Sequence, residues 1–320
     1  MLRSFLIYLS TAAWARRMVT SWGFAWRAAR RYVAGERLED ALQAVKVLND
    51  KGINATLDHL GEHTSSPELA CQAVQDVIRM LDAIDEAGVR SNVSIKLTQI
   101  GLALDYDLCA ENLKRIIKVA KGHNNFIRID MEDSHWVEQT LALYQLMITE
   151  FDSDLLGVVI QSYLYRSEVD VAKLVTAGAR VRLCKGAYKE PEENAYPKKQ
   201  DVDSSYDRIA EMLIDEAKAA GSPAVSVDGK VPPIPALATH DEMRISLLKA
   251  YAQRAGLPQA AMEFQMLHGI RRDLQEQLTR EGFPVRVYVP WGTEWYPYFV
   301  RRLAERPANL WFFISNVFRR

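Results

Sequence analysis

The 320-residue sequence is poor in cysteine: Cys71, Cys109 and Cys184 are its only three, and they lie far apart. An odd number of widely spaced cysteines cannot form the disulfide framework on which many small secreted domains depend. We therefore expect a protein of a reducing compartment, the cytoplasm. The sequence also lacks the Gly-x-Gly-x-x-Gly pattern and the phosphate-binding loop. This absence argues against a dinucleotide-binding fold, although it does not exclude FAD as a ligand.

The sequence also lacks an excess of charge of one sign and lacks long hydrophobic runs. The 40 basic and 41 acidic residues give a net charge of −1, so no overall field would attract nucleic acid, and we expect no nucleic-acid partner. The apolar run from Phe5 to Ala15 is too short to cross a bilayer. The spacing His59, Glu62, His63 matches a metalloprotease motif that requires a helix. Because it falls at the end of a predicted strand, we expect no metal site.

Residues 1–35 differ from the rest of the chain, since they contain six arginines, several aromatic residues and no acid. One interpretation is a helical arm that packs on the main domain. The other is an amphipathic helix that lies on a membrane surface. We favour the arm, place it at residues 1–50, and leave peripheral association with the inner face of the membrane open.

Short apolar segments rich in Val, Ile and Leu recur along the chain, and each precedes a helical pattern. The predicted strands are Ala55–Leu60, Asn92–Leu97, Phe126–Asp130, Gly157–Gln161, Arg180–Leu183, Ala236–Thr239, Glu263–Met266 and Val285–Val289. The predicted helices include residues 36–50, Glu68–Ala87, Cys109–Ala120, His135–Thr149, Tyr206–Ala220 and Asp241–Ala255, with a long loop at Lys189–Ser205. Eightfold alternation predicts an α/β fold, a (β/α)8 barrel over residues 51–320.

The active site of such a barrel lies where the strands end. From the second strand onward, polar side chains occupy these ends although burying them without a partner is costly. They are Lys96, Asp130, Gln161, Arg182, Lys185, Thr239, His240, Gln265 and, within the eighth strand, Tyr288. Their convergence on one rim predicts a binding site there.

The last predicted helix carries Tyr298, Arg301, Arg302 and Glu305 within roughly a 100° arc of one face. Two adjacent guanidinium groups offer several fixed donors to one carboxylate. A solvated charged face is the alternative interpretation. We favour the carboxylate clamp because the turn at residues 288–292 returns the helix toward the rim.

The strand motifs resemble, in order, those of the proline dehydrogenases in their short, single-activity bacterial form. The matching segments are Ser94–Leu97, Arg128–Asp133, Gln161–Leu164, Arg182–Tyr188, Ala238–Asp241, Glu263–Leu267 and Tyr288–Asn309. The resemblance implies a distorted barrel that binds FAD, with the eighth helix over its mouth. It also implies oxidation of L-proline to Δ¹-pyrroline-5-carboxylate, the first step of proline catabolism to glutamate, with electrons passed to a membrane quinone.

The resemblance also assigns roles by motif position. Arg301, Arg302 and Lys96 would hold the proline carboxylate, Tyr298, Tyr288 and Leu267 would enclose the ring, and Asp130 would orient polar groups nearby. The flavin would contact Gln161, Arg182, Cys184, Lys185, Gly186, Ala187, Thr239, His240 and Gln265, and Glu305 would steady the arginines beside it. The reaction itself requires fixed cations for a carboxylate and apolar walls for a ring, which these residue types provide.

Two other functions remain as alternatives from the residues. A Schiff-base aldolase on the same barrel would use Lys96 or Lys185 as its nucleophile. A non-enzymatic adaptor at a membrane surface would bind through residues 1–35. We leave the oligomeric state of the protein open, an oligomer being compatible with every one of these functions.

Overall fold

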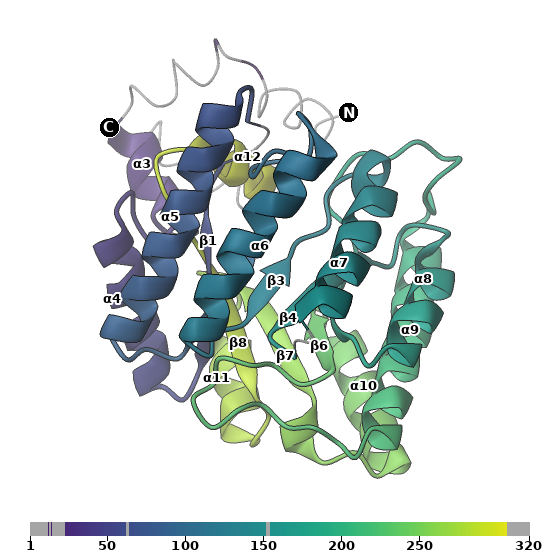
Figure 1. Ribbon diagram of the computed structural model, residues 1–320. Helices are drawn as coiled ribbons and strands as arrows, with labels where there is room; N and C mark the ends of the chain where they lie inside the picture. Colours follow the sequence, from purple (N-terminus) through teal and green to yellow (C-terminus); the bar gives the residue numbers. More distant parts are fainter. Residues whose placement is uncertain (1–11, 13, 15–22, 62–63, 152–153, 306–320) are drawn as a thin grey trace.

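A computed structural model describes residues 12, 14, 23–61, 64–151 and 154–305, without the side chains of residues 23–25, 304 and 305. Eight parallel strands form a closed barrel in chain order (Figure 1). They are β1 (Asn54–His59), β2 (Ser91–Ile95), β3 (Ile127–Ile129), β4 (Leu156–Gln161), β5 (Arg180–Cys184), β6 (Pro235–Ala238), β7 (Glu263–Leu267) and β8 (Val285–Trp291). The predicted barrel and each predicted strand are confirmed.

The barrel interior is more polar than the strand composition suggests. In the register of β2, β3 and β4, Ser94 pairs with Arg128 and Arg128 pairs with Gly157. A Cβ atom on Gly157 would lie 2.6 Å from Nη1 of Arg128, so the glycine makes room for the buried guanidinium. Arg286 and Glu263 are also fully buried, and their Nε and Oε1 atoms lie 2.9 Å apart. Alternating apolar side chains on the other face pack against the helices.

Helices surround the strands on the outside (Figure 1). They are α4 (Leu38–Asp50), α5 (Pro67–Glu86), α6 (Tyr106–Gly122), η1 (Ser134–Trp136) with α7 (Val137–Phe151), α8 (Ser167–Thr176), α9 (Lys199–Ala219), α10 (Glu242–Ala255), η2 (Gln259–Ala261), and α11 (Arg272–Arg280). Side chains of Ser66, Asp105 and Asp241 accept backbone N–H bonds at the starts of α5, α6 and α10. Such caps satisfy the first unpaired donors of each helix.

One boundary was predicted wrongly. The loop after β5 ends at Lys198, because α9 already begins at Lys199, two turns before the predicted start at Tyr206. These first turns are polar, so they carry little of the apolar periodicity that marks the rest of the helix. Asp203 instead anchors them through an ion pair with Lys185, whose Nζ lies 2.5 Å from Oδ1.

The final helix α12 (Trp295–Glu305) lies across one end of the barrel, next to α3 (Gly23–Ala29) (Figure 1). The ring centroids of Trp26 and Trp295 are 5.2 Å apart, and those of Tyr32 and Phe299 are 6.2 Å apart. The described part of the predicted arm therefore packs on α12, while its extent over residues 1–50 stays a prediction. Among the residues described, no helix combines the length and apolarity that crossing a bilayer requires.

Candidate active site

A cavity of about 840 Å³ opens at the carboxyl ends of the strands, beneath α12. Nearly all the predicted site residues line it together. They are Lys96, Asp130, Gln161, Arg182, Cys184, Lys185, Gly186, Ala187, Thr239, His240, Gln265, Leu267, Tyr288, Tyr298, Arg301 and Arg302. The exception is Glu305, the last residue of α12, whose side chain lies outside the described part of the chain.

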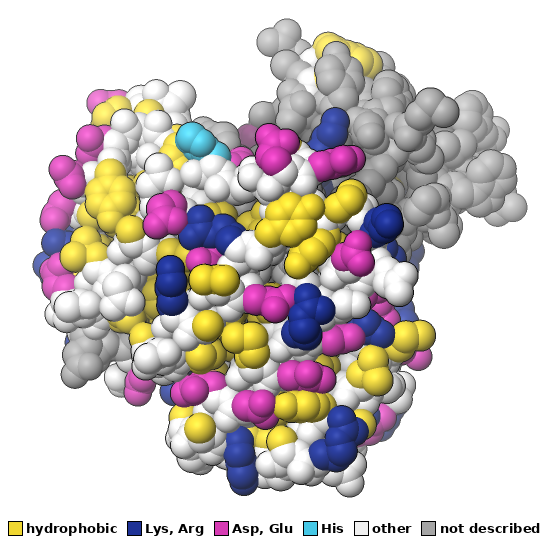
Figure 2. All heavy atoms as spheres, turned by 90° about the vertical axis from the view of Figure 1, so that its right-hand side faces the viewer, with side chains coloured by type: hydrophobic (Ala, Val, Ile, Leu, Met, Phe, Trp, Pro, Cys, Tyr) yellow, Lys and Arg dark blue, Asp and Glu magenta, His cyan; other side chains and the backbone are white. Residues whose placement is uncertain are grey.

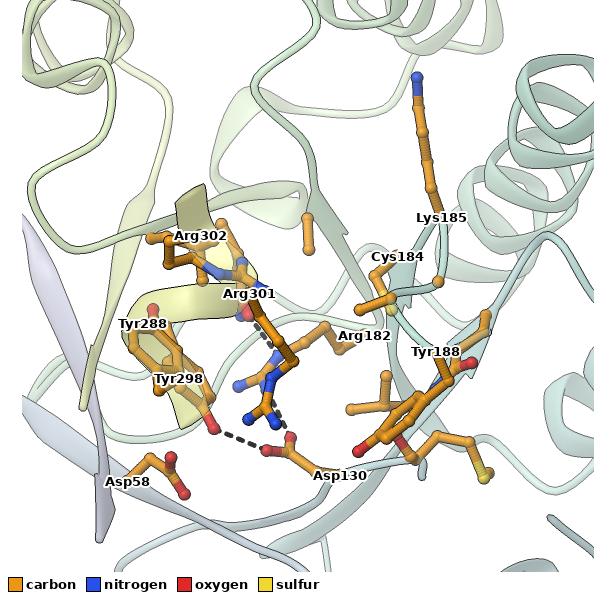
Figure 3. Close-up of a pocket in the computed structure, with 18 of the residues that line it drawn as sticks. Asp58, Asp130, Arg182, Cys184, Lys185, Tyr188, Tyr288, Tyr298, Arg301 and Arg302 are labelled. Atoms are coloured by element: carbon orange, nitrogen blue, oxygen red, sulfur yellow. Dashed lines mark hydrogen bonds and ion pairs between the residues drawn. The ribbon is translucent and has the colours of Figure 1, made fainter. Parts of the chain in front are cut away.

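Asp130, just beyond β3, is the centre of the hydrogen-bond network in the cavity (Figure 3). Its Oδ1 accepts from Oγ of Ser94 at 2.6 Å and from Nη1 of Arg182 at 2.8 Å. Its Oδ2 accepts from the Tyr288 hydroxyl at 2.8 Å. Burial and the neighbouring Asp130 carboxylate hold the pKa of Tyr288 well above its usual value, so this tyrosine remains a donor. Three strands are thus tied together at one carboxylate.

The orientation of Arg182 is fixed by a series of side-chain contacts that begins at Gln265 and continues toward the other end of the barrel. Its Nε donates to Oε1 of Gln265 at 2.6 Å. The amide nitrogen of Gln265 donates in turn to Oε1 of Glu263, also at 2.6 Å, and Glu263 pairs with Arg286. The charged Glu263 determines which end of the Gln265 amide faces Arg182, because a carboxylate only accepts. The guanidinium of Arg182 consequently has one orientation under the cavity.

Lys96 lies between two carboxylates. Its Nζ is 2.8 Å from Oδ1 of Asp58 and 4.0 Å from Oδ2 of Asp130. Burial alone would lower the pKa of Lys96, but the two carboxylates outweigh it and raise the pKa above the ordinary value. Lys96 is therefore a cation in the cavity rather than a neutral amine.

The arginine pair of α12 completes the cavity from above (Figure 3). Arg302 is only 8% exposed, and its Cζ lies 5.1 Å from the ring centre of Tyr298. Arg301 is partly exposed and extends into the same space as Asp130 and Arg182 in Figure 3. A solvated helix face would leave both arginines in water. The burial of Arg302 excludes that interpretation for this residue.

Donors and acceptors around the cavity fit the flavin that the resemblance implies. The amide nitrogen of Gln161 donates to the carbonyls of Met131 and Glu132, which leaves Oε1 buried without a donor among the described residues. A flavin ring carries an N–H group that matches this acceptor. Nε2 of His240 accepts from the backbone N–H of Leu267 at 3.0 Å, so its ring proton lies on Nδ1, a donor suited to phosphate oxygens.

The segment after β5 forms one side of the cavity. Gly186 has a φ of +115°, and a Cβ there would lie 2.4 Å from the Tyr163 ring. Only glycine fits both the left-handed conformation and this contact. Burial raises the pKa of Cys184 to about 12, so its thiol stays protonated. Lys185 points away from the group around Asp130 in Figure 3.

The sequence interpretation missed three residues of this site. Asp58 and Tyr188 line the cavity, and Ser94 bonds to both Asp130 and Arg182. Asp58 lies near the end of the first strand much as Lys96 follows the second, so its place in the strand is the signal that identifies it. Tyr188 ends the segment Arg182–Tyr188, whose resemblance to the family implies no role for this side chain. Ser94 is a small polar residue inside a strand, and sequence gives no sign of which face it occupies.

The metalloprotease-like spacing does not form a helix where it is described. His59 ends β1 and stacks on Trp291, with the ring centroids 4.4 Å apart. Glu62 and His63 lie outside the described residues. Within the described part of the chain, no three acidic, histidine or cysteine side chains are placed to hold a metal ion.

Comparison with known proteins shows what the whole chain is similar to. The family model described as "Proline dehydrogenase" matches residues 41–314. Proline dehydrogenase from Deinococcus radiodurans is 43% identical over 297 residues, which cover 92% of this chain and 91% of the relative. Proline dehydrogenase 1 from Bacillus subtilis is 38% identical over 320 residues, the whole of both chains.

The fold has solved counterparts as well. Proline utilization A from Bdellovibrio bacteriovorus, inactivated by N-propargylglycine, superposes with a TM-score of 0.79 at 24% identity. The match covers 88% of this chain and 33% of that structure, so the chain spans about a third of the larger protein. At this identity the likeness concerns the barrel alone.

Proposed function

Since the chain belongs to the proline dehydrogenase family, we propose that it oxidises L-proline to Δ¹-pyrroline-5-carboxylate with FAD in the cavity beneath α12. One observation carries the proposal. The residues suited to a carboxylate and those suited to an apolar ring, which are far apart in sequence, line a single cavity. A flavin when bound supplies the hydride acceptor that this oxidation needs.

The carboxylate of proline would bind between Arg301 and Arg302 from α12 and Lys96 from the barrel. Three fixed cations can hold one small anion in a single orientation, which places the ring carbons relative to the barrel axis. Leu267, Tyr288 and Tyr298 offer the apolar walls that a five-membered ring requires. Tyr288 cannot turn freely because Asp130 holds its hydroxyl.

The flavin would occupy the part of the cavity between β4 and β7. We assign Gln161 Oε1 to an N–H of the ring and His240 Nδ1 to the phosphates. Arg182, held by Asp130 and Gln265, would present its positive charge to the ring from below. Gly186 and Ala187 would allow close approach of the backbone, and the protonated Cys184 would act as a small apolar contact.

We further propose a membrane quinone as the final electron acceptor, with contact to the membrane surface through the N-terminal arm. This part rests on the family resemblance and on the arginine-rich composition of residues 1–35. The face in Figure 2 carries acidic and basic side chains side by side, with no region of a single sign. The arm is therefore the better candidate for attachment to an anionic surface than this face.

The geometry disfavours the aldolase alternative. A Schiff base requires a neutral lysine, but Lys96 is paired with Asp58 and has a raised pKa. Lys185 is held by two carboxylates, with Nζ 2.5 Å from Asp203 and 2.9 Å from Asp241. A non-enzymatic adaptor that binds a membrane surface through residues 1–35 would not require a polar cavity in the barrel.

An absorbance spectrum of the purified protein tests the proposal. We expect flavin bands that are bleached when L-proline is added without oxygen and restored by a soluble quinone. An unchanged flavin spectrum would exclude proline as the substrate, and a colourless protein would exclude the cofactor. Borohydride with a carbonyl compound should leave Lys96 unmodified.

A further inference from the structure

The wall of the cavity includes a carboxylate, that of Asp58, that is only partly satisfied by the hydrogen bonds of the described residues. Asp58, at the end of β1, is 1% exposed. Its Oδ1 accepts from Lys96, whereas its Oδ2 is buried without a hydrogen-bond donor among the described residues. Burying a carboxylate oxygen without a donor is unfavourable, because the oxygen loses its hydrogen bonds to water and gains none in return. Such an atom on a cavity wall is expected to meet a donor from a ligand.

The neighbouring carboxylates are already committed. Both oxygens of Asp130 accept hydrogen bonds, from Arg182 and Ser94 on one side and from Tyr288 on the other. Asp241 is paired with Lys185 and also accepts from the backbone N–H of Met243 at the start of α10. Asp58 is thus the carboxylate near Lys96 that retains an open acceptor.

The position of Asp58 matches the shape of the substrate. In a zwitterionic α-amino acid, the carboxylate and the ammonium are attached to the same carbon. Lys96 would contact the carboxylate, and Asp58 lies 2.8 Å from Lys96. The ammonium therefore comes close to Asp58. In Figure 3 Asp58 lies below the Tyr288 and Tyr298 rings that would enclose the substrate.

Resting on the proposed function, we propose that Asp58 is the proton acceptor of the reaction: its Oδ2 binds the substrate ammonium and removes one N–H proton. The nitrogen lone pair that this step frees then forms the C=N bond as the C–H bond on the adjacent ring carbon breaks. A bound flavin would take up the hydride with its two electrons, so that proline would be oxidised as the cofactor is reduced. The proton stays on Asp58 until it passes to solvent.

The surroundings of Asp58 allow this change of charge. The charged or titratable groups that act on it are Lys96 from β2, His59 beside it on β1 and Tyr288 from β8, with Asp130 beyond Lys96. Arg301 and Arg302 face the same cavity from α12. When Asp58 becomes neutral, the substrate carboxylate and Asp130 still balance Lys96.

The pH dependence of kcat/KM tests the proposal. A base within the enzyme lets the abundant zwitterion react, so we expect the wild-type value to change by less than about threefold per unit between pH 7 and 9. Asp58→Asn keeps the acceptor for Lys96 but cannot take a proton. We expect kcat/KM to fall by about 10²–10⁴ at pH 7 and then to rise about tenfold per pH unit, since only proline that arrives as the neutral amine can react. Glu294→Gln, another carboxylate on the cavity wall, should keep the wild-type slope.

A binding measurement separates this role from a structural one. Cyclopentanecarboxylate has the ring and the carboxylate of proline but no nitrogen. We expect Asp58→Asn to weaken proline binding and leave the inhibition constant of cyclopentanecarboxylate within about threefold, whereas Lys96→Met should weaken both ligands. Equal loss of both ligands in Asp58→Asn would overturn the proposal.

The remaining outcomes are also decisive. A wild-type kcat/KM that rises about tenfold per pH unit would overturn the proposal without any variant, so it stays testable even if Asp58→Asn does not fold. An Asp58→Asn variant that retains the wild-type kcat/KM at pH 7 and the wild-type slope between pH 7 and 9 would also overturn the proposal. If the wild-type protein does not oxidise proline at all, the proposed function fails instead.

Discussion

At the scale of single residues, the structure places the predicted arginine pair of α12 on the wall of the cavity. Arg302 is buried against Tyr298 and lines the cavity, so its guanidinium is held in place before any ligand binds. A preorganised cation gains more from a carboxylate than a flexible surface arginine does, since less side-chain entropy is lost on binding.

We expect Arg302→Met to raise the KM for proline by at least about 30-fold, because removing one partner of a buried charge pair costs about 2 kcal/mol or more. The methionine keeps the apolar contact with the Tyr298 ring, so flavin content should stay at the wild-type level. Steady-state kinetics and the flavin-to-protein absorbance ratio measure the two effects. Arg280→Met, at the exposed end of α11, is the control and should change neither. Loss of flavin with an unchanged KM would contradict the assignment of Arg302 to the substrate.

At the scale of elements, the strands were the most predictable part of the molecule. Parallel barrel strands are buried on their outer face by helices, so they appear as short runs of Val, Ile and Leu. Helix starts were less predictable: α9 begins earlier than its apolar periodicity, held by the long-range ion pair between Asp203 and Lys185. The positions of the strand ends in the sequence predicted which polar side chains would converge at the cavity. The partners that orient them, such as Ser94 and Glu263, depend on the register between strands and had to be observed.

The segment after β5 offers a test at this scale. We expect Gly186→Ala to lower the free energy of unfolding by about 2–4 kcal/mol, because the methyl group adds a left-handed backbone penalty to a clash with Tyr163. Gly178→Ala has the same sign of φ but no atom within 4 Å of the new Cβ. This control should lose only about 1–2 kcal/mol. Denaturant titration of both variants distinguishes them, and equal losses would show that the contact with Tyr163 is unimportant.

The packing of α12 on the N-terminal segment leads to a second prediction. Phe299 is 1% exposed and packs near Tyr32, away from the barrel core. We expect Phe299→Ala to raise the KM for proline by about tenfold or more, because a loosened α12 must be ordered again on binding. Phe283→Ala removes a buried ring next to Phe264 at the opposite end of β8. It should destabilise the protein similarly, by about 3–5 kcal/mol, without changing KM. If both variants are destabilised and both show a raised KM, the effect of Phe299→Ala does not depend on α12 in particular.

At the scale of the whole molecule, charges run through the barrel from its floor to its mouth. Arg286 and Glu263 lie at the floor, Gln265 links them to Arg182, and Asp130 joins Arg182 to the residues around the substrate cavity. Each charged group of this column, from Arg286 and Glu263 to Arg182 and Asp130, meets an opposite charge or a polar side chain. Such a column costs desolvation free energy that apolar side chains would avoid, so we interpret it as serving orientation rather than stability.

The floor pair gives the corresponding prediction for the entire fold. Glu263→Gln leaves the fully buried Arg286 without its counter-ion, although Arg286 still donates to the carbonyls of Ala55 and Gly229. We expect the free energy of unfolding to fall by about 3–5 kcal/mol. Glu276→Gln breaks the half-exposed pair with Lys51 and should cost less than about 1 kcal/mol. Urea titration measures both, and similar midpoints would show that the barrel tolerates an uncompensated charge at its floor. If Glu263→Gln folds, its bound flavin should also show a shifted spectrum, because the Gln265 amide and therefore Arg182 lose their fixed orientation.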